Sequence, residues 1–90
     1  GIVVSGYARF GDNCRIRNGV VVGLKNVDEH AAPTIGNDVD IGAGAKLLGA
    51  IKVGNRVCIG ANAVVLVDVP DDSIAVGVPA VVRPRKPLAQ

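Results

Sequence analysis

Apolar residues recur at every sixth position along most of the chain. The residue after each of these positions is glycine in six of ten cases, and the residue four places on is small or apolar in nine of ten. Two series with this spacing are present, separated by one break in register. The first is Val4, Phe10, Ile16 and Val22, and the second is Ile35, Ile41, Leu47, Val53, Ile59 and Val65.

A period of six predicts short strands wound into a coil. An amphipathic helix would instead space its apolar residues by three and four. Because six is even, strand alternation returns a side chain to the same face in every repeat. Glycine-containing pairs punctuate each repeat and exclude one long strand, so we expect a turn in every repeat. Positions one and five should point inward, and neighbouring turns should pair as parallel ladders.

The register breaks between the two series. From Val22 to Ile35 is thirteen residues (35 − 22), one more than two repeats. The segment 24–33 is mostly polar and holds the only histidine, and we expect it to form a loop that leaves one corner of the coil. Loops on a rigid scaffold often carry function.

The coil is expected to occupy residues 1–69. Pro70 cannot donate a ladder hydrogen bond and suits an exit turn. Residues 70–90 are then a C-terminal cap followed by a basic tail. Because no methionine is present, we expect the chain to be the C-terminal part of a longer protein.

Composition narrows the possible classes. Hydrophobic residues make up 49% of the 90 residues, but aromatic residues only 2%, which suits a narrow interior filled by Val, Ile, Leu and Ala. A net charge of +2 does not indicate nucleic-acid binding, and no apolar run approaches the roughly 18 residues of a membrane span. Cys14 and Cys58 lack metal-ligand spacing, and a reducing, cytoplasmic compartment is expected.

The repeat pattern resembles that of the hexapeptide-repeat acyltransferases. That resemblance implies an all-β, left-handed parallel β-helix, with three hexads in each triangular turn. Four segments are similar, more narrowly, to serine acetyltransferases and the related capsule-sugar O-acetyltransferases. Gly1–Val4 resembles their GIVV, Val21–Gly23 their TLGG, Ile41–Lys46 their IGAGAK, and Ile59–Val65 with Gly77–Ala80 their second IGA motif and GVPA tail.

The resemblance implies an acetyl-CoA-dependent O-acetyltransferase that acts as a cytoplasmic homotrimer. Acyl transfer to a hydroxyl needs a general base, for which histidine is suited. In the family this histidine lies three residues before the GIVV, so the main base is expected upstream of Gly1. His30 matches a second family histidine, on the loop, that helps to place the acceptor.

The acceptor is either serine or a sugar. In serine acetyltransferases an arginine before the loop histidine binds the serine carboxylate, whereas this chain has Glu29. A carboxylate cannot form that ion pair. A sugar hydroxyl, which has no neighbouring carboxylate, therefore competes with serine as the small hydroxyl acceptor.

The resemblance also implies a CoA site. The pantetheine arm would contact the backbone near Gly23, Ala43 and Ala61, where small residues let it approach the main chain. Arg83 and Arg85 would reach the nucleotide phosphates. No metal is implied.

Two other functions use the same coil. A non-catalytic structural or trimerisation β-helix that has lost its base would also keep alanine and glycine, because both residues fit tight corners. A γ-class carbonic anhydrase would need three histidine ligands for zinc, and His30 is the only histidine.

Overall fold

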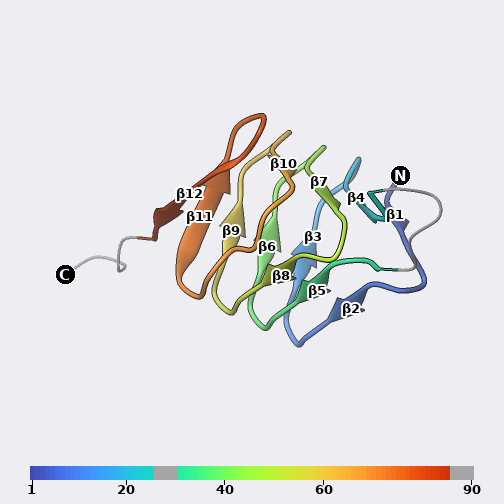
Figure 1. The fold of residues 1–90 in the computed structure, drawn as a ribbon, viewed down its shortest axis with the longest axis horizontal. Helices are drawn as coiled ribbons and strands as arrows, with labels where there is room; N and C mark the ends of the chain where they lie inside the picture. The colour runs from blue at the N-terminus through green and yellow to red at the C-terminus, as the bar shows by residue number, and fades with distance from the viewer. Residues whose placement is uncertain (26–30, 86–90) are drawn as a thin grey trace.

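The computed structural model describes residues 1–25 and 31–85 as a three-sided coil of short strands (Figure 1). The described residues form twelve strands and no helix. Face A contains β1 (Val3–Val4), β4 (Val21–Gly23), β7 (Lys46–Leu48) and β10 (Val64–Val65). Face B contains β2 (Arg9–Phe10), β5 (Thr34–Ile35) and β8 (Lys52–Val53). Face C contains β3 (Arg15–Ile16), β6 (Asp40–Ile41), β9 (Cys58–Ile59), β11 (Ser73–Val76) and β12 (Val81–Pro84).

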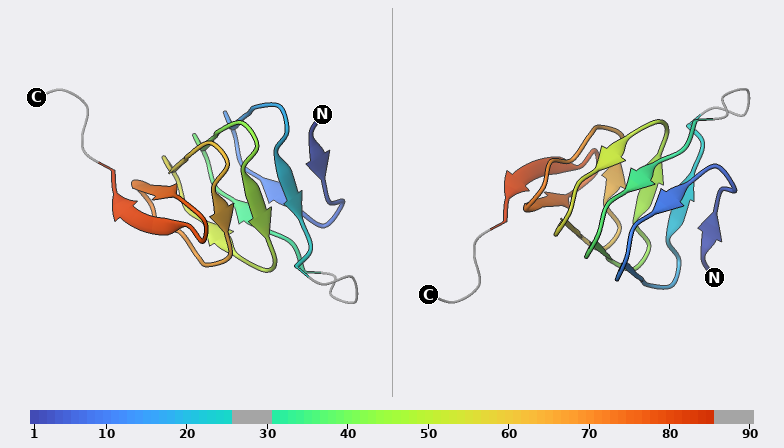
Figure 2. Two further views of the ribbon diagram at one scale, coloured as in Figure 1. Left: turned by 90° about the horizontal axis from the view of Figure 1, so that it is seen from above. Right: turned by 90° about the horizontal axis from the view of Figure 1, so that it is seen from below.

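Successive turns stack in parallel register. Thr34 pairs with Lys52, so one turn takes eighteen residues (52 − 34), or three hexads. Arg15 pairs with Asp40 across the register break, twenty-five residues away (40 − 15). The break therefore adds seven residues (25 − 18) to one turn. The strands before and after it still stack in line, as Figure 2 shows from two sides.

The predicted inward positions form the core. In the second series every position one and position five is buried, and burying a side chain such as Leu47 contributes about 2 kcal/mol. The first turn differs, since Val4 is 42% exposed and Phe10 and Ile16 are only partly buried. The cause is geometric, because β1, β2 and β3 lie at the edges of their sheets and are covered on one side only.

Glycine is required at the corner between faces B and C because successive turns meet there backbone to backbone. A Cβ atom on Gly36 would lie 2.8 Å from both the carbonyl carbon and the oxygen of Gly54. Side-chain oxygens of the next turn fill the space beside each glycine. Asn55 Oδ1 accepts a hydrogen bond from the backbone N–H of Asn37 at 2.8 Å, and Asp71 Oδ1 accepts one from Asn55 at 2.7 Å.

Four residues at this corner have left-handed backbone conformations. Asn13, Asp38 and Asp72 have φ values of 55° to 59°, which Asn and Asp tolerate better than most residues. Arg56 has the same conformation, with φ of 56°, although arginine is less suited to it than Asn or Asp. Its guanidinium donates two hydrogen bonds to the Asp72 carboxylate, at 2.6 and 3.0 Å, and so lowers the pKa of Asp72 below its ordinary 3.8.

The C-terminal strands close one edge of face C. β11 pairs in parallel with β9, and β12 then returns antiparallel along β11. The backbone N–H of Arg85 donates to the carbonyl of Asp72 at 2.8 Å. The return strand therefore ends beside the same corner from which β11 starts.

Replacing Gly36 with alanine should destabilise the coil by about 1–3 kcal/mol, because the new methyl group would overlap backbone that cannot move aside. The measurement is the urea midpoint of unfolding. Gly6→Ala is the matched control, since a Cβ atom there meets nothing within 4 Å. Equal midpoints for the two variants would show that the corner does not need glycine.

The Arg56–Asp72 pair should stabilise the fold at neutral pH and lose this effect in acid. The folded-state pKa of Asp72 is lowered, so its contribution is present above the ordinary value of 3.8 and is lost as pH falls through the folded value. Asp72→Asn should therefore lower the urea midpoint at about pH 7 and hardly at all at about pH 2. A pH-independent difference between the two proteins would contradict this assignment.

Candidate functional site

Ala43 and Ala61 stack at the corner between faces C and A, which we name the alanine corner. They are eighteen residues apart (61 − 43), one turn, and the N–H of Asn62 donates to the carbonyl of Ala43 at 2.9 Å. Both alanines are exposed. At positions 43 and 61 the main chain of this corner is therefore covered by methyl groups alone, with the Asn62 side chain beside them.

Gly23 lies at the opposite end of the face A strands. It pairs with Leu48, and its carbonyl accepts a hydrogen bond from the N–H of Gly49 at 3.0 Å. Among the described residues, a Cβ atom on Gly23 would meet nothing closer than 3.9 Å, the distance to a methyl of Val21. Unlike Gly36, this glycine is not required by packing within the coil.

The GVPA segment lies beside the alanine corner. The N–H of Val64 donates to the carbonyl of Gly77 at 3.0 Å, and the N–H of Ala80 donates to the carbonyl of Val64 at 2.9 Å. Val78, in the turn between them, is 72% exposed. Apolar surface therefore continues from the alanine corner onto the C-terminal hairpin.

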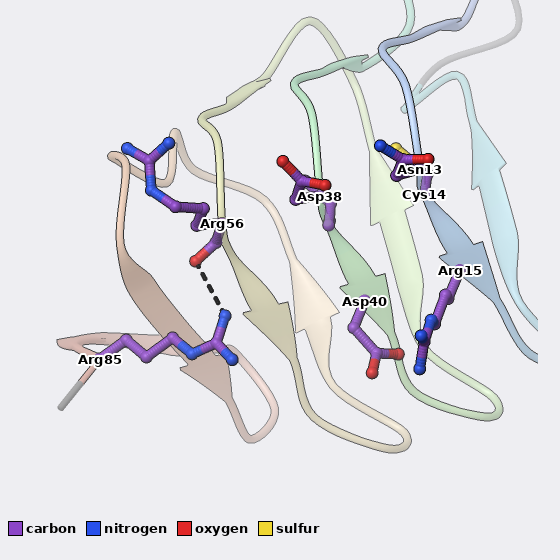
Figure 3. Close-up of a pocket in the computed structure, with 8 residues that line it drawn as sticks. Asn13, Cys14, Arg15, Asp38, Asp40, Arg56 and Arg85 are labelled. Carbon is purple, nitrogen blue, oxygen red and sulfur yellow. Dashed lines mark hydrogen bonds between the residues drawn. The ribbon is translucent and has the colours of Figure 1, made fainter. Parts of the chain in front are cut away.

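The two candidate arginines lie on the return strand. Arg83 pairs with Ile74 on face C, and Arg85 follows β12 at the corner between faces B and C. There Nη1 of Arg85 donates to the carbonyl of Arg56 at 3.3 Å (Figure 3). The structure therefore brings Ala43 and Ala61 together but leaves Arg85 at the other end of the face C strands. His30 and Glu29 lie outside the described residues.

A polar groove at the corner between faces B and C was not predicted from the sequence. It has a volume of about 570 Å³ and is lined by residues that include Asn13, Arg15, Asp38, Asp40, Arg56 and Arg85 (Figure 3). These residues come from successive turns and from the return strand, so no local motif joins them. The available signal was the polar residue two places after each corner glycine, which is Asn13 after Gly11, Asp38 after Gly36 and Arg56 after Gly54.

One ion pair at the groove involves a neighbouring arginine. Arg17 donates two hydrogen bonds to the Asp40 carboxylate, at 3.1 and 3.3 Å, and these bonds raise the pKa of Arg17 above its ordinary value. The Asp40 carboxylate is therefore already neutralised on one side of the groove.

The described parts of the chain hold neither a cluster of metal-ligating side chains nor a membrane-spanning helix. Within residues 1–25 and 31–85, no three His, Cys, Asp or Glu side chains gather where they could hold a metal ion. The same residues contain no helix of the length and hydropathy needed to cross a membrane.

Known proteins match the chain over most of its length. Residues 32–66 match the family described as bacterial transferase hexapeptide (six repeats). A serine acetyltransferase of Helicobacter pylori strain J99 is 49% identical over 81 residues, which are 89% of this chain and 47% of that protein. The chain therefore spans about half the length of this relative.

Solved structures of serine acetyltransferases are also similar to this chain. The serine acetyltransferase of Neisseria gonorrhoeae superposes with a TM-score of 0.89 at 41% identity, covering 94% of this chain and 33% of that one. In complex with serine, the same enzyme gives 0.80 at 43% identity, covering 89% and 33% of the two chains. A serine acetyltransferase in complex with CoA gives 0.85 at 42% identity, covering 92% and 34%.

These matches agree with the coil geometry. The predicted fold class, an all-β left-handed parallel β-helix of hexapeptide repeats, is confirmed. Residues 32–66 carry the repeat of the bacterial transferase hexapeptide family, and the relatives that resemble this chain over about nine-tenths of its length are serine acetyltransferases.

Proposed function

We propose that this chain is the CoA-binding coil of an acetyl-CoA-dependent O-acetyltransferase. The observation that carries the proposal is the similarity to serine acetyltransferases, one of them solved with CoA, over about nine-tenths of the chain. The coil supplies surfaces suited to such a ligand. Exposed alanines at one corner and a sterically unnecessary glycine at the far end of face A both leave backbone open to a narrow thioester arm.

The pantetheine arm is proposed to lie against the alanine corner. Ala43 and Ala61 offer little side-chain bulk, and the neighbouring Val78 adds apolar surface. Gly23 extends the proposed contact along face A. Arg83 is the proposed partner for a nucleotide phosphate, since its side chain is exposed and makes no hydrogen bond within the described residues. Arg85 is the weaker candidate because it already binds the carbonyl of Arg56.

The proposed reaction transfers an acetyl group from sulfur to oxygen. A base takes the proton of the acceptor hydroxyl, whose oxygen attacks the thioester carbonyl carbon. The new C–O bond forms and the C–S bond breaks, and the proton passes to the sulfur of CoA. The base is the upstream histidine expected from the family motif, and His30 is proposed to place the acceptor.

The acceptor is proposed to be the hydroxyl of serine or of a sugar. The complex of the gonococcal relative with serine favours serine. Glu29 favours a sugar, because it stands where the family carries the arginine for the serine carboxylate. Rates of CoA release with serine and with sugars distinguish the two acceptors.

A homotrimer is proposed as the working assembly. Face A carries the outward row Val3, Val21, Lys46 and Val64, which is apolar except at Lys46, and Leu66, just after β10, is 40% exposed. Faces B and C instead present charged residues such as Arg9 and Lys52 on B and Arg15 and Asp40 on C. Packing face A against a second copy would bury the apolar row.

CoA should bind the chain, and Gly23→Ala should weaken that binding about tenfold or more, because a methyl group would occupy the space left for the arm. The fold should tolerate this change, since the added Cβ atom meets only ordinary contacts. Isothermal titration with CoA measures the affinity, with Gly6→Ala as the matched control. A lack of heat at millimolar CoA would favour the non-catalytic scaffold instead.

Leu66→Glu should dissociate the trimer, because it places a carboxylate in the apolar surface proposed to be covered. Sedimentation equilibrium gives the mass of the assembly. Lys52→Glu, a charge change on face B, is the control and should leave the trimer intact. A monomeric wild-type chain, or a trimeric Leu66→Glu variant, would exclude face A as the interface.

A further inference from the structure

The groove between faces B and C is separate from the proposed CoA surface. It lies where the face C strands begin, whereas the alanine corner lies where they end. None of Gly23, Ala43 and Ala61 lines it. Its volume of about 570 Å³ is within the range of small-molecule sites. Of the residues that line the groove, the acetyl-transfer proposal uses only Arg85, its weaker phosphate candidate.

Some charged side chains in the groove already have an ion-pair partner, and others do not. Arg56 is held by Asp72, and Asp40 by Arg17. Arg85 uses one N–H on the carbonyl of Arg56 and keeps its other donors. In the described part of the chain, the side chains of Arg15 and Asp38 make no hydrogen bond or ion pair.

The uncommitted groups come from opposite sides of the groove. Arg15 belongs to β3 and Arg85 follows β12, so they lie on the two outermost strands of face C (Figure 3). Three arginines and two aspartates line the groove, which leaves one positive charge (3 − 2). Guanidinium groups bind carboxylate and phosphate oxygens through paired N–H donors. The groove thus favours an acidic ligand.

The Asp38 carboxylate adds a second requirement on the ligand, which is a hydrogen-bond donor. Within the described residues this carboxylate accepts no hydrogen bond, and it lies in the same groove as the guanidinium groups of Arg15 and Arg85. A purely anionic ligand would be repelled by it. A ligand that also carries hydroxyl groups would donate a hydrogen bond to Asp38 while its acidic group bound the arginines.

We propose that the groove at the corner between faces B and C binds a small hydroxylated anion, such as a sugar phosphate. Arg15 and Arg85 hold the acidic group, and Asp38 accepts a hydrogen bond from a ligand hydroxyl. Arg56 contributes positive charge, and its pair with Asp72 fixes the corner that carries it.

The test is a titration of the ¹⁵N-labelled chain, in a buffer free of phosphate, with glucose 6-phosphate, inorganic phosphate and glucose. Glucose 6-phosphate should shift the amide signals of Asn13, Arg15, Asp38 and Arg85 saturably. Inorganic phosphate should bind more weakly at the same residues, and glucose should leave them unchanged. Absence of saturable shifts with glucose 6-phosphate, or equal shifts with glucose, would overturn the proposal.

Arg15→Gln should weaken glucose 6-phosphate binding about tenfold, since it removes a charge-assisted hydrogen bond. The variant should fold normally, because the exposed Arg15 side chain makes no hydrogen bond or ion pair with any residue that the structure describes. Arg83→Gln is the matched control, an arginine of β12 that does not line the groove. Asp38→Gly, which removes the acceptor at a position where φ is 58°, should remove the preference for glucose 6-phosphate over phosphate. Equal binding by the Arg15 and Arg83 variants, or an unchanged preference in the Asp38 variant, would refute the assignment.

Discussion

Backbone-to-backbone contact between successive turns is the constraint on which the rest of this structure depends. At Gly36 and Gly54 the turns approach so closely that no side chain fits between them, and the N–H of each glycine donates to the strand of the next turn, at 2.8 Å to Val53 and Val69. From Thr34 to Ile59 the ladder and the corner repeat every eighteen residues, and the same local solution serves the longer and shorter turns on either side.

Because of this constraint, the residues that stabilise the coil are different from the residues that are available for binding. The inward positions and the corner glycines hold the coil, so the outward positions of the three faces are left free to differ. Face A is mainly apolar, and face C carries the charged groove at its beginning and the alanine corner at its end. Gly23 shows the distinction most clearly, because its neighbours would accept a side chain that the neighbours of Gly36 would not.

The sequence predicted the coil because the period of six marks the side chains that point into its core. It also predicted the stacking of Ala43 over Ala61, which follows from their separation by one turn. It did not predict the corner groove, since Arg15, Asp38 and Arg85 become neighbours only after turns of unequal length and a reversed strand are folded. The exposure of Val4 also escaped prediction, because periodicity marks a side chain as inward without showing whether another turn covers it.

The most direct measurement of the central claim is the detection of scalar couplings across the corner hydrogen bonds by NMR. The coil predicts couplings from the amide nitrogen of Gly36 to the carbonyl carbon of Val53 and from Gly54 to Val69. Couplings to residues three or four positions away, typical of a helix, or to an antiparallel partner would contradict the three-sided coil and the surfaces derived from it.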